Sequence, residues 1–219
     1  MNAEELIEEV EDIIQDPSYD SEAILKHLNR GQLAIANKLL LPGLSDGHAS
    51  VNTVLSQNHA TLPTNYHKAL HVAQVDGLPV KVYNNKALMI ADYGKLTTQT
   101  GAVTGVTVDS GELVYQRVPA TATAVELFYY RKPTPMTESG TSFPDGLGGQ
   151  MADNDDFDFA LIHYACWRLF ERIEQGLEGQ KIDTGYHKNE FYERVGELRL
   201  FCKEGRSHPV PPITKGSWP

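Results

Sequence analysis

Apolar residues in this chain repeat with a helical period near both ends and with a strand period in the middle. One helical stripe follows spacings of 3, 4, 3 and 4 and consists of Leu25, Leu28, Gln32, Ile35 and Leu39. A second stripe with the same spacings runs from Phe159 to Ile173, and a shorter amphipathic helix is expected in residues 6–14. One segment cannot follow both periods at once. The chain must therefore change from helix to strand and back to helix.

The middle of the chain predicts short strands, because Val, Thr and Tyr are frequent in it from about Val51 onward. Asp76-Gly77 is a pair that tolerates the positive φ angles of a hairpin turn, and apolar segments flank it on both sides. A short helix is expected within residues 84–95. The predicted strands are Leu70–Val75, Leu78–Tyr83, Thr97–Val108, Leu113–Val118 and Thr123–Tyr130.

These patterns predict an α+β fold that is mainly a helical bundle, with long helices at both ends of the chain and a small antiparallel β region inserted between them. A length of 219 residues suits one domain with such an insertion. We expect the bundle in residues 1–50 and 151–205, the β region in 51–132, a long loop in 133–156 and an extended C-terminal tail in 206–219.

Composition excludes several classes of protein. Hydrophobic residues make up 41% of the chain, an ordinary globular share that argues against a disordered or collagen-like protein. The 19 basic and 29 acidic residues give a net charge of −10, which argues against holding nucleic acid by neutralising its phosphates. Cys166 and Cys202 have no metal-binding or redox spacing, so we expect free, buried thiols in a reducing compartment. No apolar run approaches the length of a membrane span.

The motifs that carry catalysis or cofactor binding are missing from the sequence. It contains no GxSxG, no HExxH and no dinucleotide fingerprint. His67 and His71 stand four residues apart, but no third metal ligand is evident. We therefore expect no catalytic residue, no metal and no cofactor, and predict that the protein is not an enzyme. A hydrolase that uses a pair of carboxylates is the weakest alternative.

Two irregular segments have unusual compositions. The segment Pro133–Asp156 contains three Pro, four Gly and five acidic residues, and structureless segments of that length are often functional. Its apolar side chains suit burial better than solvent, and they are Met136, Phe143, Leu147 and Met151. The last segment, Arg206–Pro219, contains four Pro, two bases and no acid, and is expected to be extended. The segment has a net charge of +2, whereas the rest of the chain has a net charge of −12.

Several phrases, taken in order, resemble the head-to-tail adaptor (connector) proteins of tailed bacteriophages. Ile24–Leu39 (ILKHLNRGQLAIANKL) is similar to the helix that opens these proteins, and Leu62–Tyr66 (LPTNY) precedes strands as it does there. Glu126–Thr137 (ELFYYRKPTPMT) resembles their strand that closes into a Pro-rich loop. Phe159–Leu169 (FALIHYACWRL) resembles the long helix that follows that loop. The resemblance covers roughly residues 20 to 205.

The resemblance implies a structural virion protein at the head–tail junction, present in the host cytoplasm before assembly. Such adaptors form a ring of identical copies, expected here to be twelve, which contacts the portal protein above and a tail or stopper protein below. DNA then passes through the channel without specific binding. C-terminal segments in this family reach the portal, so the residues expected to bind the portal are Val210, Pro211, Pro212, Ile213 and Trp218. The four apolar loop residues are expected to contact a neighbouring subunit or a tail protein.

Two other functions remain open from the sequence. A tail-completion or stopper protein would bind assembled adaptors and not the bare portal. A carbohydrate-binding or host-binding module would use the strand region, where Phe128, Tyr129 and Tyr130 stand in a row. The C-terminal tail has two open interpretations, a docking arm or an untethered end.

Overall fold

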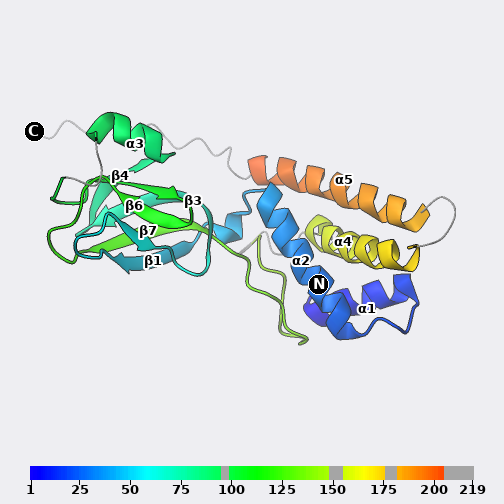
Figure 1. Ribbon diagram of the computed structural model, residues 1–219. Coiled ribbons are helices and arrows are strands. Elements are labelled where there is room, and N and C mark those ends of the chain that lie inside the picture. The colour runs from blue at the N-terminus through cyan, green and yellow to red at the C-terminus, as the bar shows by residue number, and fades with distance from the viewer. Residues whose placement is uncertain (95–98, 148–154, 176–181, 205–219) are drawn as a thin grey trace, which may run out of the picture. The chain divides into compact units, whose positions relative to one another are not determined.

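The computed structural model describes residues 1–94, 99–147, 155–175 and 182–204 (Figure 1). The chain divides into two compact units. The helical unit contains residues 1–42 and 135–219, and the β unit contains residues 43–134. The β unit is thus an insertion between the two halves of the helical unit along the sequence.

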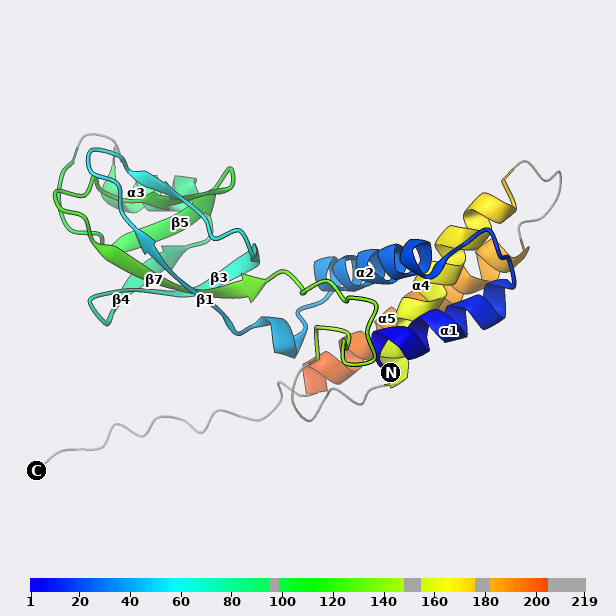
Figure 2. The ribbon, with the colours of Figure 1, turned by 90° about the horizontal axis from the view of Figure 1, so that it is seen from below.

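Four long helices build the helical unit (Figure 2): α1 (Ala3–Ile14), α2 (Ser21–Lys38), α4 (Asp155–Ile173) and α5 (Ile182–Glu204). Helix α4 is central, because α5, α2 and α1 all pack against it. Asn2 and Glu5 form a reciprocal capping box at the start of α1, and Asp20 caps α2 by accepting a bond from the Ala23 N–H. The helices expected near both ends of the chain are therefore confirmed.

Most residues of the stripes predicted from the helical spacing are buried in this unit, but Phe159, the first residue of the stripe on α4, is 37% exposed. On α5 the buried side chains recur every three or four residues and are His187, Phe191, Val195, Leu198 and Cys202. Phe191 lies against the rings of Tyr164 and Trp167 on α4, with centroids 5.3 Å and 6.0 Å away. These contacts join the last helix of the chain to the central one.

The β unit is a seven-stranded sheet in the order β1-β7-β3-β4-β5-β6-β2. All neighbours are antiparallel except β4 and β5, which are parallel and are joined through α3 (Lys86–Tyr93). The two edge strands, β1 and β2, also contact each other, so the sheet nearly closes into a barrel. The strands are β1 (Gly47–Asn52), β2 (His59–Thr61), β3 (Tyr66–Val75), β4 (Leu78–Tyr83), β5 (Gly105–Asp109), β6 (Glu112–Tyr115) and β7 (Ala124–Arg131).

Side chains from most of these strands fill the inside of the sheet, among them Leu113, Tyr115, Leu127 and Tyr129. Gln116 is buried with them, and its side chain is fully bonded. Its amide oxygen accepts from the Gly105 N–H at 2.9 Å, and its nitrogen donates to Ala102 O at 2.9 Å. The hairpin predicted at Asp76-Gly77 is confirmed by the pairing of β3 with β4.

The prediction of a mainly helical bundle with a small antiparallel β insert is wrong. The insert is a seven-stranded mixed sheet with its own core and its own helix. Its size was missed because β1 and β2 are short and pair with β7 and β6, strands that lie far away in the sequence. Its mixed character was missed because the predicted strand Thr97–Val108 gives no sign of its direction, and β5, which overlaps the end of that segment, runs parallel to β4.

Both thiols are free and buried, as expected. Burial raises the pKa of the Cys166 thiol to about 12, so it stays protonated and unreactive at neutral pH. None of the described helices combines the length and the apolar character that crossing a bilayer requires.

Candidate functional site

The segment that follows β7 is bonded to the helical unit by two side chains of α2. Asn29 makes a reciprocal pair of bonds with Met136: its amide oxygen accepts from the Met136 N–H at 2.7 Å, and its nitrogen donates to Met136 O at 3.0 Å. The Gln32 amide oxygen accepts from the Asp145 N–H at 2.5 Å. At the start of α1, the Ala3 N–H donates to Ser142 O at 2.7 Å. The described part of the loop, residues 133–147, is therefore held in place although it forms no helix or strand.

The loop residues predicted to contact another protein have different positions. Met136 and Leu147 are each only 3% exposed, so in the single chain they already pack inside the helical unit. Phe143 is 64% exposed and is available to a partner. Met151 lies outside the described residues. Contact with a neighbouring subunit or a tail protein stays a prediction, and Phe143 is the described side chain that best suits it.

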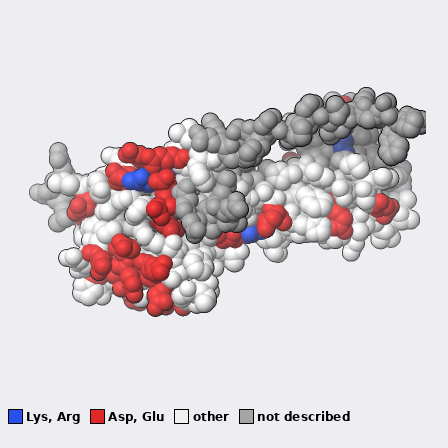
Figure 3. Space-filling view, turned by 180° about the vertical axis from the view of Figure 1, so that it is seen from behind, with Lys and Arg blue, Asp and Glu red and all other residues white. Residues whose placement is uncertain are grey.

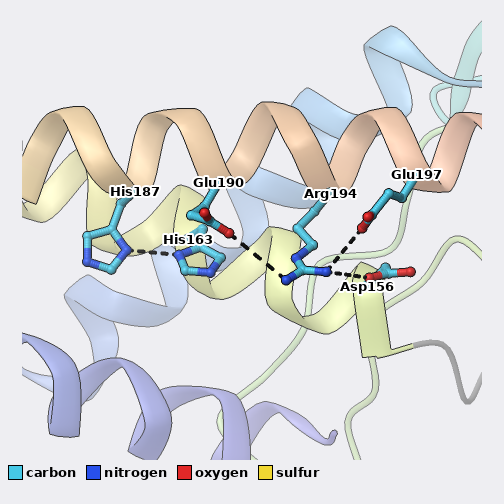
Figure 4. A network of polar contacts seen from close by, with 6 residues as sticks. All are labelled: Asp156, His163, His187, Glu190, Arg194 and Glu197. Carbon is cyan, nitrogen blue, oxygen red and sulfur yellow. Dashed lines mark hydrogen bonds and ion pairs between the residues drawn. The ribbon is translucent and has the colours of Figure 1, made fainter.

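A network of polar side chains lies along the junction of α4 and α5 (Figure 4). Arg194 of α5 donates to Asp156 of α4 at 3.1 Å and to Glu197 at 3.0 Å. About two helical turns away, Nδ1 of His163 lies 2.9 Å from Nδ1 of His187. One of these two nitrogens must carry the proton that the other accepts, so the pair needs at least one neutral ring.

The chemistry of this network favours a structural role. Burial lowers the pKa of both His163 and His187, the charge of Arg194 lowers that of His163 further, and both rings are therefore neutral at pH 7. Among the described residues, no group of three or more His, Cys, Asp or Glu side chains is arranged to hold a metal ion. His67 and His71 lie on β3, outside this network. The network joins α4 and α5 through the ion pair of Arg194 with Asp156 and the hydrogen bond between the two histidine rings.

The row of three aromatic residues on β7 is mostly buried. Tyr129 and Tyr130 are buried, and the Tyr129 hydroxyl donates to Asn65 Oδ1 at 2.6 Å. Phe128 is 37% exposed and stacks on His48 with ring centroids 4.7 Å apart. A sugar-binding surface needs exposed aromatic rings, and of these three residues only Phe128 is partly exposed.

Acidic side chains gather over α1, as Figure 3 shows on one face of the molecule. The helix contains six acidic residues and no basic one, and all six are exposed: Glu4, Glu5, Glu8, Glu9, Glu11 and Asp12. Such a surface repels phosphate groups and attracts positively charged ones.

The sequence identified the apolar loop residues but missed Asn29 and Gln32, the residues that fix the loop. A signal existed for Gln32, because it falls within a stripe of apolar residues, and a polar side chain on a buried helix face needs a partner. The residues predicted to bind the portal, Val210, Pro211, Pro212, Ile213 and Trp218, lie outside the described residues.

Comparison with known proteins gives one match to a family model. The family is described as SU10 adaptor protein, and its model matches residues 1–212 of the chain. No curated protein matches the sequence.

Proposed function

Because this chain belongs to the SU10 adaptor protein family, we propose that it assembles as a ring between the portal protein of a phage capsid and the tail. The single observation that carries the proposal is the family match, which spans nearly the whole chain. It confirms the resemblance to head-to-tail adaptors drawn from the phrases of the sequence. The proposed ring would contain twelve copies and extend the channel through which DNA leaves the capsid.

The charge of the protein supports this role. Each copy carries a net charge of −10, and identical acidic copies around a channel would repel the DNA backbone, so that DNA slides without binding. The proposed role is structural and needs no catalytic step. The portal-docking segment would be the C-terminal tail, whose net charge of +2 contrasts with the acidic body of the chain.

The test mixes the purified protein with the portal ring from the same genome and weighs the products by native mass spectrometry. We expect one discrete species with about one adaptor copy per portal subunit, because closed rings stack with matched symmetry. Portal rings of unchanged mass beside free monomer would overturn the proposal.

A truncated chain that ends at Gly205 tests the role of the tail. We expect it to keep the circular dichroism and the unfolding transition of the full chain, because the helical core lies in residues that it retains. It should no longer join the portal ring in the same native mass measurement. If the truncated chain unfolds, the tail belongs to the core and is no docking arm.

A further inference from the structure

The helical unit contains a basic pocket between α2 and α4. Its volume is about 200 Å³, and it is lined by His27, Arg30, Tyr164, Arg168, Glu171 and Arg172. Glu171 pairs with Arg168 at 2.8 Å. Arg30 and Arg172 have no carboxylate partner in the part of the chain that the structure describes. The pocket therefore has two uncompensated positive charges in a protein whose net charge is −10.

A buried side chain at this pocket lacks a hydrogen-bond partner. His27 is only 4% exposed, and its Nδ1 atom has no partner among the described residues. Its pKa is lowered to about 4, first by burial and then by the positive charges of Arg172, Arg30 and Arg168. An uncompensated polar atom beside three guanidinium groups is the environment that a bound anion would complete.

A second pocket in the same unit has the opposite charge. Its volume is about 350 Å³, and it lies between α1 and the start of α2, with one wall from the loop. The carboxylates that line it are Glu4, Glu8 and Glu11 of α1 and Glu138 of the loop. No lysine or arginine pairs with these four side chains among the described residues.

The two pockets lie on different sides of α2. Asn29, which bonds the loop on the acidic side, is two residues from His27, and residues two apart on a helix do not face each other. A single copy therefore cannot join its own two pockets. Two copies can do so, and a contact between different surfaces of identical subunits repeats from copy to copy, which builds a ring when the rotation between copies closes.

We propose that the basic pocket of one copy binds the acidic side chains of the next copy, so that α1 of each subunit docks between α2 and α4 of its neighbour. Arg30 and Arg172 then pair with carboxylates such as Glu8 and Glu11, and charge-assisted bonds of this kind fix the orientation of the two subunits. The inference rests on the proposed function, because it specifies the contact that joins copies in the ring.

Two charge-reversal variants test the contact. The first, Arg30→Glu with Arg172→Glu, has acidic residues at both pockets and a net charge of −14 (−10 − 4). The second, Glu8→Lys with Glu11→Lys, has basic residues at both and a net charge of −6 (−10 + 4). All four residues are exposed, so the fold should persist, as circular dichroism would verify. Since both variants remain acidic overall, net charge cannot drive them together.

The readout is assembly on the portal ring, measured by native mass spectrometry. Each variant alone should decrease the share of portal that carries adaptor by about tenfold or more, because every contact then joins like charges. An equimolar mixture should restore assembly with the two variants alternating, because every contact then joins opposite charges. A matched control, Lys132→Glu with Arg199→Glu, also has a net charge of −14 but changes exposed residues outside both pockets, and it should assemble like the parent chain.

Three results would overturn the inference, and they differ from one another. If the parent chain assembles and either variant also assembles on its own, this contact is excluded and the proposed function still stands. A parent chain that never joins the portal would overturn the proposed function and, with it, the contact. The third result has two parts: the parent chain binds a short DNA duplex, and Arg30→Glu with Arg172→Glu loses that binding but still forms rings. In that case the pocket binds phosphate groups and not the carboxylates of a neighbour.

Discussion

At the scale of single residues, two glycines show how much the effect of one methyl group depends on its surroundings. A Cβ atom at Gly47 would lie 2.5 Å from Tyr129 O, so β1 would have to move away from β7. We expect Gly47→Ala to lower the free energy of unfolding by about 1–3 kcal/mol. At Gly196 on α5 nothing lies within 4 Å, and Gly196→Ala should raise it by up to about 1 kcal/mol through helix propensity. Urea unfolding measures the unfolding free energy of both variants. A change of the same sign and size in the two would contradict the prediction.

At the scale of elements, one side chain of α2, Asn29, makes both hydrogen bonds that hold Met136 of the loop. Asn29→Ala removes both bonds to Met136 and leaves the backbone groups of that residue without their partners. We expect a loss of about 1–3 kcal/mol in unfolding free energy and faster amide exchange at Met136. Leu33→Ala on the same helix is the control, because Leu33 is exposed and its loss should change stability by less than about 0.5 kcal/mol. Unchanged exchange at Met136 in Asn29→Ala would show that other contacts hold the loop.

The elements also show which signals the sequence contains. The helices and the β3–β4 hairpin could be predicted, because capping residues, apolar spacing and Asp76-Gly77 act over a few neighbouring positions. The strands β1 and β2 could not be predicted, because the partners of β1 come 72 to 82 residues later in the chain and those of β2 come 51 to 55 residues later. The burial of Met136 could be expected from its apolar side chain, but its partner Asn29 could not, since that contact joins residues 107 positions apart.

At the scale of the whole molecule, acid should weaken the helical unit. His27 has a pKa near 4 in the folded chain and near 6.5 when unfolded, so the unfolded state binds more protons as the pH falls below 6.5. The unfolding free energy should fall by about 2 kcal/mol between pH 7 and pH 5 from this residue alone. His163 and His187 act in the same direction, whereas Asp158, whose pKa is raised by burial, acts in the opposite one.

The variant His27→Gln isolates this effect, because it keeps a polar side chain but cannot titrate. Urea unfolding at pH 7 and pH 5 should show a smaller loss in the variant than in the parent chain, with a difference of about 2 kcal/mol. Equal losses in the two proteins would mean that His27 is not held neutral by the fold.

The β unit begins and ends on two neighbouring strands. Gly47 of β1 pairs with Tyr129 of β7, and beside them Arg131 donates to Asp46 at 2.8 Å and to Gly43 O at 3.1 Å. A segment whose two ends already meet can be inserted, lengthened or removed without rethreading the chain that carries it. One in-frame crossover on each side of its gene segment could therefore exchange the whole β unit, because both crossovers fall where the two ends of the unit already meet.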